Sequence, residues 1–393
     1  MSLEKENRTV EPGRRKKVLI VAGEASGDLH GANLVRAMGE VDPDIRFYGV
    51  GGKRLEEAGV ELVARSSEMA VVGLTEVFSK FGFILSVFFR LKKSLAAEKP
   101  DLAVLIDYPD FNIPLARAAK KSGVKVFYYI SPQVWAWRKG RIRSIKKYVD
   151  RMAVIFPFEK DFYEKAGVAV TFVGHPLLDT AWATGSREDV RSKLGLDRRA
   201  TTVALLPGSR DNEVARLLPL MTKAAEILSK EFPDAQFVLP VADTLDEGLV
   251  TSMIRRSTAK VLVVADSIYD VLAAADVAVV TSGTATVETA LMETPMVVVY
   301  RVSGLTYYVG RLLVDVQNIA MANIIAGKTV VVELIQDDAT AGAIAKEVAE
   351  ILRDDIKRSA IVAELKKVRE RLGSPGAAKR AARLAVELLN SND

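Results

Sequence analysis

The chain has 393 residues, of which 49% are hydrophobic and 27% charged, and its formal net charge is +5. This composition excludes a disordered chain, and the length allows two domains, because single hydrophobic cores rarely grow past about 250–300 residues. Cysteine is absent and the two histidines, His30 and His175, lie far apart in the sequence, so we expect no disulfide, no metal site and no other cofactor.

The N-terminal segment is polar and ends in a basic cluster, "GRRKK". It lacks the apolar centre of a signal peptide, so we expect a disordered tail over residues 1–16 and a cytoplasmic protein. From Lys17 onward, short apolar runs recur and each is followed by a helical pattern. Strands that are apolar on both faces and alternate with helices are typical of parallel sheets covered by helices on both sides.

Nine or more such runs are more strands than one sheet usually contains, so the fold class is predicted to be α/β with two doubly wound, Rossmann-like parallel-sheet domains. Glycine, proline, threonine and serine accumulate over residues 174–189, which marks the break between the domains. The predicted boundaries are 17–175 for the first domain, 176–372 for the second and 373–393 for a C-terminal helix that crosses back to the first.

The first apolar run leads into "EASGDLHGA", residues 24–32, where ligands of open parallel sheets usually bind. Its glycine spacing matches neither the dinucleotide fingerprint nor a Walker loop, which argues against nicotinamide and ATP. One interpretation is a plain strand-to-helix turn in which Ser26 or Asp28 caps the helix. The other is a substrate site in which Glu24 meets a sugar hydroxyl, next to Ser26 and Gly27.

Residues 81–89, "FGFILSVFF", form the most apolar stretch and are followed by "RLKK". Nine residues cannot span a bilayer, which takes about 20. The segment could be a buried core helix, but its cationic end favours an interfacial helix on an anionic membrane surface. The predicted membrane contacts are Phe81, Phe83, Ile84, Phe88, Phe89, Arg90, Lys92 and Lys93.

The stretch "VLIDYPDFN", residues 104–112, places two carboxylates just after an apolar run. Asp110 stands at the expected N-cap of the next helix, and capping accounts for it. Asp107 falls at the end of the strand, where partial burial would raise its pKa towards neutrality and suit it to act as a general base. A hydrogen-bonded structural carboxylate is the alternative.

Trp135, Trp137 and six cations between residues 138 and 147 form an aromatic and basic segment. No nucleic-acid-binding motif accompanies it, so a phosphorylated substrate or anionic lipid is the better partner.

In the second half, Gly208, Ser209 and Arg210 follow an apolar run and could bind an anion, or could simply begin a capped helix with a solvated arginine. The stretch "TSGTATVE", residues 281–288, gives the stronger phosphate signal. Its small residues start a helix whose N–H groups could hold a diphosphate without a metal, and Glu288 lies one turn further along, within reach of a sugar diol.

Taken together, these motifs resemble the lipid-A-disaccharide synthase family, whose members are glycosyltransferases of the GT-B architecture. The matching stretches are "AGEASGD", "GVGG", "MAVVGLTEV", "PDFN", "SPQVWAWR", "PFEKDFY", "GHP", "LLPGSR", "SGTATVE" and "YR". The resemblance implies two domains facing a central cleft and a place in lipid A biosynthesis, on the cytoplasmic face of the inner membrane. The implied reaction condenses UDP-2,3-diacylglucosamine with 2,3-diacylglucosamine 1-phosphate, with inversion and without a metal, to a β(1→6) disaccharide and UDP.

The resemblance also implies roles for individual residues. Asp107 would take the proton of the acceptor's 6-hydroxyl, with His175 as a rival base, and Glu24 would lie near the sugar. UDP would be bound by the remaining candidates, which are Gly208, Ser209, Arg210, Ser282, Gly283, Thr284, Glu288 and Asn323. Asn323 follows Ala322, where the family usually has proline. Two other functions stay open, a UDP-sugar 2-epimerase of the same fold and a non-catalytic lipid- or sugar-nucleotide-binding protein, and so does the oligomeric state.

Overall fold

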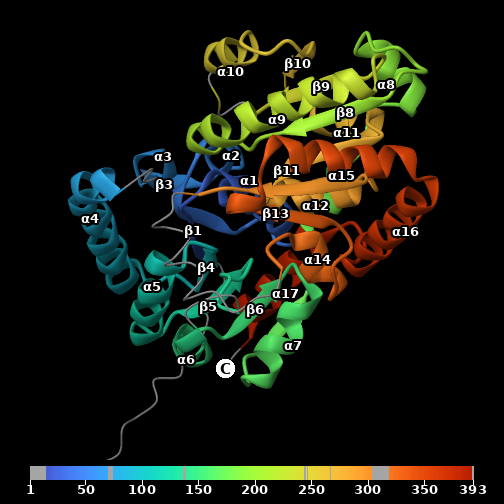
Figure 1. Cartoon of the computed structure of the whole chain (residues 1–393). Coiled ribbons are helices and arrows are strands. Elements are labelled where there is room, and N and C mark those ends of the chain that lie inside the picture. The colour runs from blue at the N-terminus through green and yellow to red at the C-terminus, as the bar shows by residue number, and fades with distance from the viewer. Residues whose placement is uncertain are drawn as a thin grey trace, which may run out of the picture. The chain divides into compact units, whose positions relative to one another are not determined.

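The computed structural model describes residues 15–69, 74–135, 139–242, 245, 247–265, 267–302 and 318–391. The predicted tail over residues 1–16 therefore lies almost entirely outside the described residues. The chain forms two compact units, the first made of residues 1–176 with 376–393 and the second of residues 177–375. Figure 1 labels most of their helices and strands.

The first unit contains a parallel sheet in the order β3-β2-β1-β4-β5-β6-β7. Its strands are β1 (Lys17–Ala22), β2 (Arg46–Gly51), β3 (Glu61–Arg65), β4 (Leu102–Ile106), β5 (Lys125–Tyr129), β6 (Arg151–Val154) and β7 (Val170–Phe172). Its helices are α1 (Ala25–Val41), α2 (Lys53–Glu57), α3 (Ser66–Met69), α4 (Leu74–Glu98), α5 (Pro109–Lys121), the 3₁₀ turn η1 (Lys139–Arg141), α6 (Ile142–Tyr148), α7 (Pro157–Lys165) and α17 (Ala377–Asn390).

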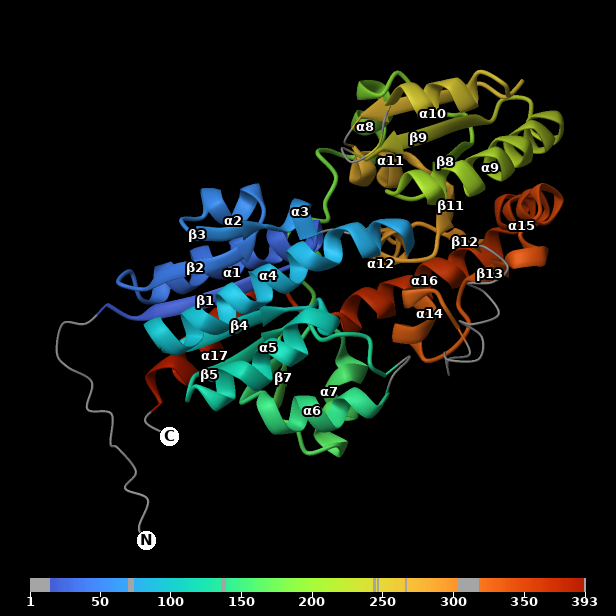
Figure 2. The ribbon, with the colours of Figure 1, turned by 90° about the vertical axis from the view of Figure 1, so that its left-hand side faces the viewer.

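Two hydrophobic cores cover the two faces of this sheet, because successive side chains of a strand point to opposite faces. Tyr128 belongs to the core beneath α4, α5 and α6, whereas Tyr129 belongs to the core beneath α1 and α17. Helix α17 returns from the far end of the sequence and lies along α1 and β5 (Figure 2). Lys125 fixes its end by donating hydrogen bonds to the carbonyl oxygens of Leu388 and Ser391.

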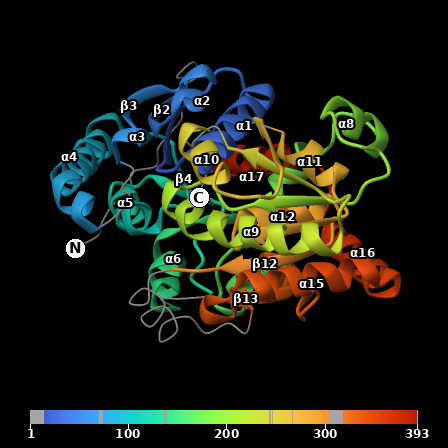
Figure 3. The ribbon, with the colours of Figure 1, turned by 45° about the horizontal axis from the view of Figure 1, so that its top comes forward.

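The second unit contains a parallel sheet in the order β10-β9-β8-β11-β12-β13. Its strands are β8 (Thr202–Leu206), β9 (Gln236–Val241), β10 (Val261–Ala265), β11 (Val277–Thr281), β12 (Met296–Tyr300) and β13 (Val332–Ile335). Its helices are η2 (Pro176–Asp179, which begins one residue before the unit), α8 (Arg187–Lys193), α9 (Asp211–Glu231), α10 (Glu247–Ile254), α11 (Ile268–Ala274), α12 (Thr284–Leu291), α14 (Met321–Ala326), η3 (Gln336–Asp338), α15 (Ala341–Arg353) and α16 (Asp355–Arg371). Helices α9 and α15 lie side by side against this sheet (Figure 3).

The predicted fold class is confirmed, since both units are parallel α/β sheets with strand orders that reverse in the middle. In the first unit the order reverses between β1 and β4, and in the second between β8 and β11. Ligands of such sheets bind beyond the carboxyl ends of the strands at these reversal points. The loops after these four strands are therefore the natural places to look for a site.

Candidate functional site

Glu24 and Asp107 lie at the reversal point of the first sheet. The neighbouring strands β1 and β4 pair in parallel up to Ala22 and Ile106; Asp107 is the next residue after β4, and Glu24 is the second residue after β1. Burial raises the pKa of Asp107 to about 6, and the negative charge of Glu24 contributes in the same direction. The first unit thus places a weakly acidic carboxyl, fit to accept a proton near neutral pH, beside a second carboxylate.

The turn after β4 differs from the one expected. Tyr108, in a left-handed conformation with φ of 46°, is the N-cap of α5, and no side chain caps this helix. Asp110 instead lies in the first turn of α5, where it is exposed and pairs with Arg141. The expectation that Asp110 caps the helix is therefore wrong, because the backbone turns two residues earlier than the sequence rule assumes.

Ser26 and Gly27 lie in the first turn of α1, whose N-cap is Glu24, and no side chain caps this helix either. Ser26 is exposed, whereas Gly27 packs close to Ala22 and Ile106. Asp28 is buried and accepts hydrogen bonds from the backbone N–H groups of Gly52, Arg54 and Leu55 at 2.6, 3.0 and 3.1 Å. Asp28 thus stabilises the start of α2 and not that of its own helix.

His175 lies near the end of the first unit and is 3% exposed. Its ring contacts that of Phe156, with the ring centroids 5.0 Å apart. Burial, and to a smaller extent the nearby His30, lowers the pKa of His175 to about 3, so the imidazole is neutral at physiological pH. A group that holds a proton so weakly is a poorer general base than Asp107.

The loop after β8 carries Gly208, Ser209 and Arg210. Gly208 has φ of 120°, a conformation that favours glycine, and a Cβ there would also displace the Glu213 side chain, whose Oε2 would lie 2.5 Å away. Ser209 and Arg210 are exposed, and Arg210 pairs with Glu213 at 2.9 Å. Arg210 is the N-cap of α9, so the loop presents a guanidinium and the N-terminal end of a long helix.

The loop after β11, the neighbouring strand, carries Ser282, Gly283 and Thr284. Gly283 has φ of 139° and is the N-cap of α12, and both Gly283 and Thr284 are exposed. Ser282 donates its hydroxyl hydrogen to the carbonyl of Ile319 at 3.0 Å. The start of α12 is therefore exposed at the reversal point of the second sheet, where an anion site is expected.

Glu288 follows one turn into α12 and accepts a hydrogen bond from the Tyr269 hydroxyl at 3.1 Å. Burial raises the pKa of Glu288, while this hydrogen bond works in the opposite direction.

Asn323 is fully buried in α14 and its side-chain amide bonds to the protein itself. Its Nδ2 donates to Val331 O and Glu333 Oε1 at 2.9 and 2.7 Å, and its Oδ1 accepts from the N–H groups of Val330 and Val331. Glu333 also accepts from the N–H groups of Ile319 and Ala320. In this structure Asn323 therefore supports the segment from residue 318 onward rather than facing an open surface.

Helix α4 divides the predicted membrane residues between core and surface. Phe83, Ile84 and Phe88 pack partly against the core of the first unit. Phe89 is 59% exposed and Leu85, which was not among the predicted contacts, is 38% exposed. The cations Arg90, Lys92 and Lys93 are exposed as well, and the Phe81 side chain lies outside the described residues.

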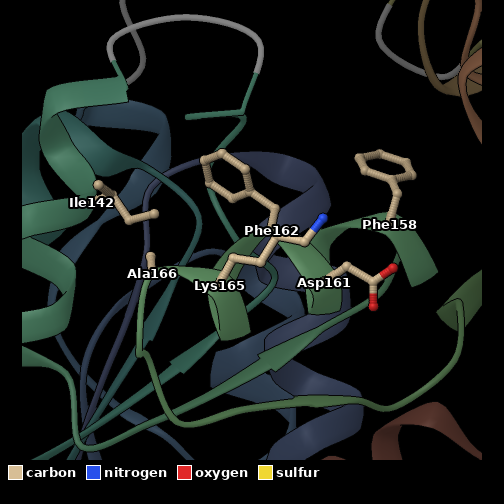
Figure 4. Close-up of a pocket in the computed structure, with 6 residues that line it drawn as sticks. All are labelled: Ile142, Phe158, Asp161, Phe162, Lys165 and Ala166. Carbon is tan, nitrogen blue, oxygen red and sulfur yellow. The ribbon is translucent and has the colours of Figure 1, made fainter.

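Figure 4 shows an apolar depression on the outer side of α6 and α7. Its lining residues are Ile142, Phe158, Asp161, Phe162, Lys165 and Ala166. Phe158, Asp161 and Phe162 belong to the stretch "PFEKDFY", but their spacing is that of an ordinary helix and did not predict a pocket. Of the aromatic and basic segment before it, Trp137 and Arg138 lie outside the described residues.

Within the described ranges, no group of histidine, aspartate and glutamate side chains has the arrangement of a metal site. In the same ranges, no helix is both long and apolar enough to cross a membrane.

Comparison with known proteins adds the family context. The family model described as lipid-A-disaccharide synthetase matches residues 18–387. A relative from Syntrophus aciditrophicus, named lipid-A-disaccharide synthase, is 58% identical over 379 residues, which cover 96% of this chain and 99% of the relative.

Solved structures of similar fold have much lower identity. The UDP-GlcNAc 2-epimerase from Neisseria meningitidis bound to UDP-GlcNAc gives a TM-score of 0.60 at 12% identity and covers 94% of this chain and 98% of that one. The glycosyltransferase of kitacinnamycin gives a TM-score of 0.63 at 17% identity and covers 96% and 100%. Because this fold serves both epimerases and glycosyltransferases, the structural likeness alone does not separate the two activities.

Proposed function

The chain belongs to the lipid-A-disaccharide synthase family, and on this premise we propose which of its residues carry out the synthesis of the lipid A disaccharide. The family membership does not favour a 2-epimerase or a non-catalytic binding protein. The substrates that we propose are UDP-2,3-diacylglucosamine as donor and 2,3-diacylglucosamine 1-phosphate as acceptor. The products are the β(1→6) disaccharide 1-phosphate and UDP.

Asp107 is the general base of this reaction. Its carboxylate takes the proton of the acceptor's 6-hydroxyl as that oxygen forms a bond to the anomeric carbon of the donor. The bond from this carbon to the diphosphate breaks, and its electron pair leaves with UDP. The observation that carries this assignment is the position of Asp107 at the reversal point of the first sheet, together with a pKa of about 6.

UDP is bound by the second unit. The turn that begins α12 and the loop from Gly208 to Arg210 follow the ends of β11 and β8, which are neighbouring parallel strands. Donors held there stabilise the charge that develops on the leaving diphosphate, and no step of this scheme requires a metal. Glu288 lies one turn further along α12, and its carboxylate contacts the ribose hydroxyls.

The test measures UDP release from the two substrates with and without added Mg²⁺. Asp107→Asn should lower kcat by roughly 10²–10⁴-fold and leave the Kd for UDP unchanged, because UDP binds to the other unit. Asp110→Asn is the matched control: it removes a carboxylate three residues away that is exposed and paired with Arg141, and should keep kcat. An Asp107→Asn enzyme with nearly full activity would refute the assignment, and loss of activity in His175→Gln alone would point to the rival base.

Helix α4 supplies the contact with the membrane. Phe89 and Leu85 are exposed apolar residues, and Arg90, Lys92 and Lys93 are exposed cations on the same helix. Apolar and cationic side chains together suit the interface of an anionic lipid surface, which would place the enzyme on the cytoplasmic face of the inner membrane.

Sedimentation with vesicles that contain phosphatidylglycerol tests this contact. Phe89→Asp should weaken binding, whereas Ile356→Asp should not, although Ile356 of the second unit is 84% exposed. An equal loss of vesicle binding in the two variants would show that α4 is not a specific membrane-binding surface.

A further inference from the structure

The turn that carries Asp107 has an unusual backbone. Asp107 and Tyr108 have φ of 42° and 46°, and Ile130, just beyond the neighbouring strand β5, has φ of 61°. This left-handed region is unfavourable for a residue other than glycine, and such residues persist only where the surroundings enforce them. Three of them at the ends of two adjacent strands require specific contacts that hold the turn.

Two buried side chains supply these contacts. The Asn112 side chain, which is 0% exposed, donates from Nδ2 to the carbonyl oxygens of Ile106 and Asp107 at 3.0 and 2.8 Å. The hydroxyl of Tyr128, also 0% exposed, donates to the same Asp107 carbonyl at 2.6 Å. The Asp107 carbonyl therefore receives hydrogen bonds from two different elements, α5 and β5.

The Tyr108 ring holds the turn from the other side. A Cβ at position 23 would lie 2.4 Å from Cδ1 of Tyr108, so the ring occupies the space that Gly23 leaves open. The same ring stacks on Phe111, with centroids 5.7 Å apart and an angle of 27° between the planes. The turn is thus enclosed between the end of β1 and the first turn of α5.

We propose that Asn112 and Tyr128 are positioning residues, which fix the Asp107 carbonyl and thereby aim its carboxyl at the acceptor hydroxyl. The proposal rests on the proposed role of Asp107 as the base. Because φ sets the direction of the side chain relative to the strand, relaxation of Asp107 to an ordinary negative φ would turn the carboxyl away from this direction. A displacement of about 1 Å at a reacting group can cost roughly 10²-fold in rate.

Tyr128→Phe is the decisive variant, because it removes one oxygen and leaves the aromatic ring in the core. We expect kcat to fall roughly 10–100-fold, while KM for both substrates and the Kd for UDP stay within about twofold. Tyr129→Phe is the matched control, since the next residue along β5 also loses a buried hydroxyl but belongs to the core on the opposite face of the sheet. It should keep kcat. Asn112→Asp is a second variant, which replaces the donor by an acceptor at the same size and should lower kcat further.

Thermal unfolding of each variant establishes that it is folded at the assay temperature. If Tyr128→Phe keeps full kcat, or if Tyr128→Phe and Tyr129→Phe lower it equally, the positioning role is refuted. Asp107→Asn, measured in the same series, distinguishes failure of the proposed base from failure of the positioning role. An active Asp107→Asn enzyme overturns the proposed base itself, whereas an inactive one beside a fully active Tyr128→Phe enzyme overturns only the positioning role.

Discussion

The pKa of Asp107 makes a quantitative prediction for the pH dependence of the rate. A carboxyl with a pKa of about 6 is protonated below that pH and then cannot accept a proton, so kcat/KM, which reports the pKa of the free enzyme, should fall as the pH is lowered through 6. At pH 5 about one-tenth of the free enzyme carries the ionised base, and kcat/KM should be about one-tenth of its plateau. With the ordinary pKa of 3.8, more than about nine-tenths would be ionised at pH 5 and the rate would hardly change.

Glu24→Gln tests the electrostatic part of this shift. Removal of the neighbouring negative charge should move the midpoint of the kcat/KM profile to lower pH, though not to 3.8, because burial is the larger cause and remains. The assay follows UDP release at substrate concentrations well below KM from pH 4.5 to 8. Glu370→Gln, the same charge change at an exposed position of α16 in the second unit, should leave the midpoint in place. A flat profile down to pH 4.5, or an unmoved midpoint in Glu24→Gln, would refute the reasoning.

Four further predictions concern stability and nucleotide binding. Asp107→Asn should raise the free energy of unfolding by about 3 kcal/mol at pH 7 and should not change it below pH 4. The reason is that ionisation of a buried acid with a raised pKa costs stability as the pH rises from 3.8 to 6. Urea titrations at pH 7 and below pH 4 measure the two free energies. Burial raises the pKa of Glu159 to about 7, so ionisation of this carboxyl should lower the free energy of unfolding of the wild type by roughly 3 kcal/mol between pH 4.5 and 7. Glu159→Gln should not show this loss. Asp28→Asn should cost about 2–4 kcal/mol in the same titration, because its carboxylate accepts three backbone N–H bonds. Gly208→Ala should raise the Kd for UDP in calorimetry roughly tenfold, because positive φ costs another residue about 1–2 kcal/mol, whereas Gly342→Ala, in open space on α15, should leave it unchanged.

The sheets were predictable because their strands are apolar on both faces and alternate with helices. The position of the candidate residues after the strands follows from the same pattern, since parallel strands end at one edge. What the sequence could not give is which strands are neighbours. The proximity of Glu24 and Asp107 depends on the pairing of β1 with β4, which are separated by β2 and β3 in the sequence.

Local rules failed where tertiary contacts overrode them. Serine and aspartate near the helix starts predicted capping by Ser26 and Asp110, yet the N-caps are Glu24 and Tyr108. No sequence signal marks a left-handed conformation at Asp107, because glycine is the usual indicator and is absent there. The burial of Asn323 was equally hidden, since its partner Glu333 comes from a later strand.

The return of α17 to the first sheet has a consequence for how the protein is made. Ala381, Ala382 and Ala385 of this helix belong to the core that they share with β1, β4 and α1. The ribosome releases them only after the whole second unit, which is continuous in sequence from Leu177 to Pro375. The unit that is synthesised first is therefore completed only after the second, and nascent chains should expose the apolar face beneath α17 until that helix has been synthesised.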